Sequence, residues 1–181
     1  WGCLVDDDFI ASFIEKSDRD KEVIRHEFAE KFLNINNRVF QNNPKDLVIN
    51  THVCRGNYAS TWFGQGGYDK IADELFGKED VNAYYLEFDT ERAGTFESLA
   101  KVSGEKKVVL GLITSKNPTL EEKEVIIARI KEASKYVPLD RLYLSPQCGF
   151  ASTEEGNRLT EEEQWAKLRF IKEIADEVWG K

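Results

Sequence analysis

The sequence contains no methionine and is poor in histidine, cysteine and proline, with two, three and four of these among 181 residues. It has no apolar run near the roughly 20 residues that a membrane-spanning helix needs, and no signal peptide opens it. These absences predict a protein without a membrane partner. Because position 1 is Trp rather than Met, we expect the chain to be a piece of a longer protein.

A basic excess is also missing, since 25 Lys and Arg face 33 Asp and Glu and leave a net charge of −8. Nucleic-acid-binding proteins need basic side chains to neutralise phosphates, so this charge argues against a nucleic-acid partner. Three cysteines, an odd number in a chain this long, are unlike the disulfide framework of a secreted protein. We therefore predict a cytoplasmic protein whose thiols are free to bind metal or to react.

The chain is long enough for one domain with a hydrophobic core. Its apolar and charged fractions, 41% and 32%, are typical of a globular protein. Four short, nearly all-apolar runs predict strands that are covered on both faces. They comprise residues 47–52, 83–88, 108–113 and 142–144.

Helical patterns separate these strands. In residues 21–40 the apolar side chains recur every three or four positions and predict one buried helix face. This face consists of Ile24, Phe28, Phe32, Ile35 and Val39. Residues 68–76 repeat the pattern. Two Thr-x-x-Glu capping boxes, beginning at Thr119 and Thr160, predict the starts of two further helices.

Alternation of strands and helices predicts an α/β fold with a parallel sheet of four βα units. Two architectures fit this order, an open doubly wound sheet and half of a (β/α)₈ TIM barrel. A whole barrel typically needs about 250 residues, so four βα units make half of one. The absence of a native start favours the barrel half.

Four side chains that can bind metal lie at or after strand ends. His52 and Cys54 end the first predicted strand, Glu87 ends the second, and Cys148 follows the fourth. The carboxyl ends of parallel strands build the site in such folds, so these residues can converge. Two thiolates, one imidazole and one carboxylate suit tetrahedral zinc. Taken singly, a cysteine here is more often a small buried hydrophobe, and a glutamate is often a partner for arginine.

Polar residues in the adjoining loops are candidates for substrate binding. Arg55, Asn57 and Arg92 could orient either a substrate carboxylate or the zinc ligands. A surface charge pair is the alternative for each arginine.

Residues 52–58 and 145–150, together with Glu87, resemble the catalytic barrel of cobalamin-independent methionine synthase. The closer likeness is to the shorter, single-barrel homologues of that family, and it runs through nearly the whole chain. The resemblance implies that His52, Cys54, Glu87 and Cys148 are the zinc ligands. It also implies that residues 1–181 form a single partial domain, the C-terminal half of a zinc-binding TIM barrel.

The activity implied by the resemblance is zinc-dependent transfer of a methyl group to a thiol, with homocysteine giving methionine. Glu87 is then the catalytic ligand that yields its place when the thiol binds. Family members carry a His after the strand that corresponds to residues 108–113, whereas this chain has Thr114, Ser115 and Lys116. That departure leaves open whether the methyl donor is a folate or another compound.

Two other functions remain open from the sequence. The same zinc chemistry could alkylate a different thiol, or the chain could be a truncated, non-catalytic zinc-binding fragment. Half a barrel also leaves a strand edge and one core face without partners. We therefore expect self-association through the open half-barrel, or continuation in a longer chain.

Overall fold

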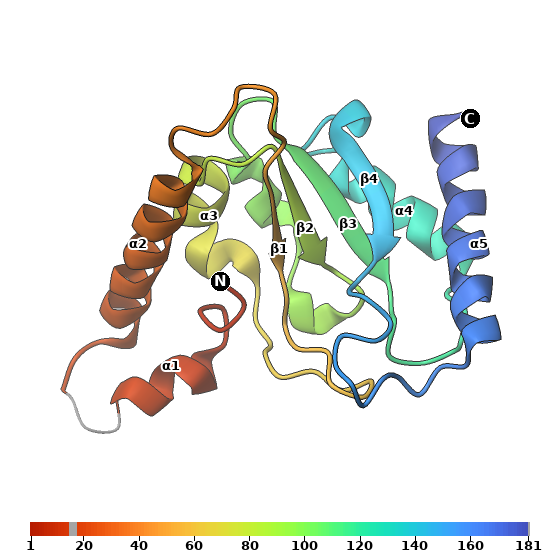
Figure 1. Cartoon of the computed structure of the whole chain (residues 1–181), viewed down its shortest axis with the longest axis horizontal. Coiled ribbons are helices and arrows are strands. Elements are labelled where there is room, and N and C mark those ends of the chain that lie inside the picture. The colour runs from red at the N-terminus through yellow and green to blue at the C-terminus, as the bar shows by residue number, and fades with distance from the viewer. Residues whose placement is uncertain (15–17, 181) are drawn as a thin grey trace.

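The computed structural model describes residues 1–14 and 18–180, and in this part of the chain it contains one four-stranded sheet (Figure 1). The strands lie in sequence order and every neighbouring pair is parallel. They are β1 (Asn50–Val53), β2 (Ala83–Glu87), β3 (Lys107–Ile113) and β4 (Leu142–Pro146). The expected strands are therefore present, with ends that differ by up to three residues.

Helices connect and flank these strands. The α-helices are α1 (Asp7–Ile14), α2 (Lys21–Phe40), α3 (Ala72–Lys78), α4 (Lys123–Ala133) and α5 (Glu161–Trp179). Short 3-10 helices are η1 (Tyr68–Ile71), η2 (Glu91–Ala93), η3 (Phe96–Lys101) and η4 (Leu139–Arg141). Helices α1 to α3 flank the β1 side of the sheet, and α4 and α5 flank the β4 side (Figure 1). Among the described residues, no helix is both long and apolar enough to cross a membrane.

Sequential parallel strands joined by helical crossovers form an α/β unit with the arrangement of half a (β/α)₈ barrel. The predicted fold class is therefore confirmed. The crossover from β2 to β3 departs from a regular βα unit, because η2 and η3 take the place of an α-helix.

The two faces of the sheet differ in their exposure. Tyr84, Leu86 and Leu110 are buried on the face that the helices cover. On the opposite face Tyr85 is 39% exposed and Tyr143 is 42% exposed. The expectation that the strands are covered on both faces is therefore wrong at Tyr85 and Tyr143, whose open face corresponds to the interior of a complete barrel.

One of the two predicted capping boxes is wrong. Helix α4 begins at Lys123, after Glu122, and has no side-chain cap. The Thr119 carbonyl instead accepts a 2.7 Å hydrogen bond from Lys167, which ties that segment to α5. The second box is confirmed, because the Thr160 hydroxyl accepts from the Glu163 amide and the Glu163 carboxylate accepts from the Thr160 amide.

Helix α2 has the predicted bounds and buries Ile24 as predicted, but the C-terminal part of the predicted face is exposed. Phe32, Ile35 and Val39 are 37%, 60% and 67% exposed. The buried face contains Arg25, whose guanidinium donates to the Leu4 carbonyl and pairs with Asp7. The apolar pattern could not reveal this orientation, because it depends on a buried arginine whose partners, Leu4 and the exposed Asp7, lie outside the helix.

Candidate metal centre

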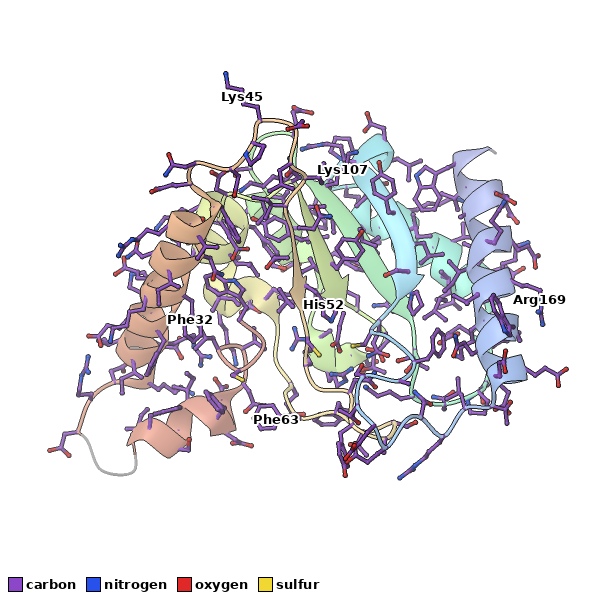
Figure 2. All side chains as sticks on the ribbon, viewed as in Figure 1. Phe32, Lys45, His52, Phe63, Lys107 and Arg169 are labelled. Carbon is purple, nitrogen blue, oxygen red and sulfur yellow. The ribbon has the colours of Figure 1, made fainter. Side chains whose placement is uncertain are left out.

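The four predicted metal ligands lie together at the carboxyl end of the sheet. One ligand atom from each of His52, Cys54, Glu87 and Cys148 lies within 4.8 Å of the others. Strand register explains part of this, because His52 pairs with Tyr85. Cys54 and Glu87 follow two residues later, Cys54 directly after β1 and Glu87 as the last residue of β2. Figure 2 shows His52 between Lys107, at the amino end of β3, and Phe63, in the loop after β1.

The spacing of these atoms fits a tetrahedral zinc ion. The two sulfurs of Cys54 and Cys148 are 3.8 Å apart, and the Nε2 of His52 is 3.6 Å from the Cys148 sulfur. Zinc–sulfur bonds of about 2.3 Å and zinc–nitrogen bonds of about 2.0 Å separate tetrahedral ligands by about 3.8 Å for two sulfurs and about 3.5 Å for nitrogen and sulfur. The chemistry of the donor set and its geometry therefore both suit zinc.

His52 is oriented by the neighbouring strand. Its Nδ1 lies 3.2 Å from the Tyr85 carbonyl oxygen, which can only accept a hydrogen bond. Nδ1 therefore carries a hydrogen, which leaves Nε2 facing Cys148, free to bind a metal in the neutral ring and able to donate to the Cys148 sulfur when the ring is protonated. A histidine that ligates a metal is commonly fixed by such a hydrogen bond from its other nitrogen.

Glu87 is fully buried at the end of β2, and both carboxylate oxygens have partners. Oε1 accepts a 2.7 Å hydrogen bond from the Arg55 amide, and Oε2 accepts one of 3.1 Å from Arg92. Burial raises the pKa of Glu87, and these two donors oppose that shift. A carboxylate has about four lone-pair positions, so two hydrogen bonds leave it able to bind a metal.

Tyr68 holds the backbone of Glu87, a role that the sequence did not reveal. Its hydroxyl donates to the Glu87 carbonyl at 3.2 Å and accepts from the Glu87 amide at 3.0 Å. Tyr68 is completely buried. The available signal was that a buried tyrosine hydroxyl usually needs a partner.

The two thiols share one hydrogen bond. This bond, with a further contribution from His52, lowers the pKa of the Cys148 thiol well below its usual range. The same bond raises the pKa of Cys54. The pair therefore ionises first at Cys148, and thiolate is the form of cysteine that ligates metals.

The two arginines predicted to contact substrate lie behind the ligands. Arg55 is 1% exposed, with its guanidinium over the Tyr68 ring and bonded to the Gly66 carbonyl. Arg92 pairs with Glu87 at 3.1 Å and with Asp89 at 3.0 Å. Both stand where they orient ligand-bearing segments, and direct contact with a substrate stays a prediction.

Asn57 links two loops that carry thiols. We call residues 54–63 the β1 loop and residues 147–160 the β4 loop. The Asn57 amide donates to the Gly149 carbonyl at 2.6 Å and to the Ser152 hydroxyl at 2.7 Å, so it joins the β1 loop to the β4 loop. Its predicted role in substrate binding is likewise untested by this geometry.

The site opens onto a largely apolar cavity of about 650 Å³. The cavity is lined by His52 and Cys148 together with apolar side chains that include Tyr85, Phe150 and Leu168. His52 and Cys54 are exposed, and Cys148 is partly so. A small molecule can therefore approach the thiols and the imidazole directly.

β3 contributes no side chain to the cluster because Gly111 lies in register with Glu87. A Cβ added at Gly111 would lie 2.7 Å from the Leu86 carbonyl oxygen and 2.7 Å from the Gln147 Cα. Both neighbours are backbone atoms, so only glycine fits here.

Comparison with known proteins matches this chain to one family. The sequence profile described as cobalamin-independent synthase, catalytic domain, matches residues 5–177. The Bacillus subtilis proteins YxjG and YxjH are 50% identical over 154 residues and 45% identical over 182 residues. These alignments cover 84% and 97% of this chain but 41% and 48% of the relatives, so the chain spans less than half their length.

A solved structure shows the same similarity. The crystal structure of a Listeria monocytogenes protein described as a vitamin-B12-independent methionine synthase superposes with a TM-score of 0.65 at 41% identity. The match covers 84% of this chain and 42% of that protein.

Proposed function

Since the chain belongs to the cobalamin-independent methionine synthase family, we propose that it is the zinc-binding part of a cytoplasmic methyltransferase that activates a thiol for S-methylation. Homocysteine is the proposed substrate and methionine the product, with a folate or another methylated compound as donor. His52, Cys54, Glu87 and Cys148 are the proposed zinc ligands. The observation that carries this proposal is the convergence of their four ligand atoms within 4.8 Å.

Zinc, when bound, would lower the pKa of a substrate thiol from its ordinary value of about 8.5 and so supply the nucleophile at neutral pH. Two thiolates and one carboxylate give the donor set a charge of −3. The same set keeps the site electron-rich, which favours a reactive sulfur over a polarised carbonyl.

Glu87 is the ligand that we expect to yield its place to the thiol. Its carboxylate already accepts hydrogen bonds from the Arg55 amide and from Arg92. These two donors can stabilise the carboxylate charge whether or not it contacts a metal. Replacing Glu87 by the substrate thiol would therefore require less free energy than replacing one of the two cysteine thiolates.

The accessible cavity favours a catalytic site over a purely structural one. Structural zinc sites are closed by four protein ligands, whereas catalytic sites keep a position open to substrate. Here His52 and Cys148 line the cavity of about 650 Å³. A thiol that enters from this cavity would still have to replace Glu87, because four protein ligands fill a tetrahedral shell.

Metal analysis and cobalt spectroscopy test the proposal. The purified chain should hold one zinc per molecule, and Cys148→Ser should lose it. With cobalt in place of zinc, added homocysteine should shift the visible spectrum, because its sulfur joins the cobalt coordination. Zinc binding without any shift would leave the structural alternative in place. A larger shift with a different thiol would favour alkylation of that thiol.

We also propose that residues 1–181 act as one half of a barrel, completed by further chain or by a second copy. Partial exposure of Tyr85 and Tyr143 on the open face of the sheet supports this. Sedimentation of the isolated chain should therefore reveal dimers or larger species. Monomeric, cooperatively unfolding material would contradict it.

A further inference from the structure

We propose that Lys116 is a positioning residue that holds the β1 loop, and through Asn57 the β4 loop, in the geometry that the two metal-binding thiols require. The inference rests on the proposed zinc site and identifies what preorganises it. Lys116 is not one of the four ligands, and it comes from the loop after β3, the strand that supplies no ligand.

All three hydrogen-bond donors of the Lys116 ammonium are engaged by the β1 loop. Nζ donates to the Gly56 carbonyl at 3.0 Å, to the Asn57 side-chain oxygen at 3.1 Å and to the Thr61 carbonyl at 3.2 Å. These acceptors span six residues that begin two positions after Cys54. One side chain thus fixes both ends of the turn that follows this thiol.

This turn has a backbone conformation that needs such support. Ala59 and Ser60 have φ values of 44° and 67°, in the left-handed region that is unfavourable for residues other than glycine. Gly56 has φ 97°, and a Cβ there would lie 2.7 Å from the Phe63 amide nitrogen. Contacts from outside the loop must therefore compensate for its strain.

Asn57 carries the constraint to the second thiol. Its side-chain oxygen accepts from Lys116, while its side-chain nitrogen donates to Gly149 and Ser152 in the β4 loop. Gly149 directly follows Cys148, and the Ser152 hydroxyl lies 3.8 Å from the Cys148 sulfur. Lys116 and Asn57 therefore form a continuous link between the segments that carry Cys54 and Cys148.

A second lysine provides a matched control at the other end of β3. Lys106 is also part-buried and donates three hydrogen bonds, to the Phe76 carbonyl, the Tyr84 hydroxyl and the Ser103 hydroxyl. These acceptors lie at the amino end of the sheet. Removal of either ammonium deletes the same number of hydrogen bonds, but only one deletion touches the thiol-bearing loops.

The test compares Lys116→Met with Lys106→Met, using zinc alone in competition with a chromophoric chelator. Lys116→Met should raise the zinc Kd about 10- to 100-fold, as loss of a residue that orients metal ligands typically does. Lys106→Met should leave the Kd within about twofold. Asn57→Ser breaks the same link from its other side and should weaken zinc binding in the same direction.

Hydrogen exchange in metal-free protein gives a readout that does not depend on zinc. Amides of residues 55–61 should exchange faster in Lys116→Met and at the wild-type rate in Lys106→Met. Wild-type zinc affinity and wild-type exchange in Lys116→Met would overturn the inference. If the wild-type chain bound no zinc, the proposed function would fail, and exchange alone would decide whether Lys116 holds the loop. The bond from Ser60 to Asn157 remains in every variant and should keep the loops folded.

Discussion

The two ends of the parallel sheet use their buried polar groups differently. At the amino end, Lys106 and Tyr84 donate to backbone carbonyls of α3, and the Tyr84 ring packs edge-on against Phe76. At the carboxyl end, Arg92 and Lys116 hold the segments that carry Glu87 and Cys54. The first arrangement stabilises the fold, and the second orders a site. Stability and metal affinity should therefore respond to different substitutions.

Cys148→Ser should give the largest difference between the effect on zinc affinity and the effect on stability. Loss of one thiolate should weaken zinc binding by more than about a hundredfold, beyond the cost of losing a residue that only orients ligands. Cys148 is partly exposed, so the free energy of unfolding of the metal-free chain should change little. Metal analysis and urea unfolding measure the two effects. Cys3→Ser, at a thiol outside the four-residue cluster, should keep the zinc.

Phe76→Ala, at the amino end, should lower stability and leave zinc binding in place. Phe76 is completely buried and packs against the rings of Tyr68 and Tyr84. Its loss should lower the free energy of unfolding by about 3–5 kcal/mol, which urea denaturation can measure. Folded protein at low temperature should still bind one zinc. A loss of zinc without a loss of stability would break the contrast between the two ends.

Arg92→Met should have a smaller effect, centred on the carboxyl end. Glu87 and Asp89 would both lose a guanidinium partner while remaining buried. We expect the zinc Kd to rise about tenfold, measured by chelator competition. Arg141→Met removes hydrogen bonds to the Gly104 and Lys106 carbonyls at the amino end and should leave the Kd unchanged. Equal effects of the two substitutions would contradict the assignment of Arg92 to the site.

The smallest effect concerns pH. Burial raises the pKa of Glu79 above its ordinary value of 4.5, so its contribution to stability is present below that value and is lost as the pH rises through the folded-state pKa. Glu79→Gln lacks this titration. The free energy of unfolding of the wild type should therefore fall relative to that of Glu79→Gln between pH 4 and pH 7. A parallel pH dependence in urea titrations would contradict this.

The sequence predicted the parallel α/β fold because each strand is a short apolar run and each connection carries a helical period or turn. It also placed the four candidate ligands at strand ends, where parallel strands bring them together. The spacing of His52 and Cys54 was enough to place these two residues together. Cys148 could be placed beside them only once the order of all four strands was predicted. The resemblance to methionine synthase named the same four residues.

What the sequence could not predict depends on contacts between distant segments. Thr119 fits a capping box, but its carbonyl accepts a hydrogen bond from Lys167 and α4 begins later. Tyr68 lies in a segment with an apolar helical pattern, although its hydroxyl forms hydrogen bonds with both the amide and the carbonyl of Glu87. Lys116 reads as an exposed loop lysine, and its three acceptors lie about sixty residues earlier in the chain. Local patterns contain no record of such partners.

Gly111 has a consequence for attempts to redesign this centre. A ligand that is to join Glu87 from the next strand would have to replace Gly111, and backbone atoms at 2.7 Å leave no room for its first carbon. Conversion to a three-histidine hydrolytic centre must therefore use positions other than Gly111. The residue types that bind the metal can change, but the backbone of the neighbouring strands prevents a ligand at Gly111 of β3.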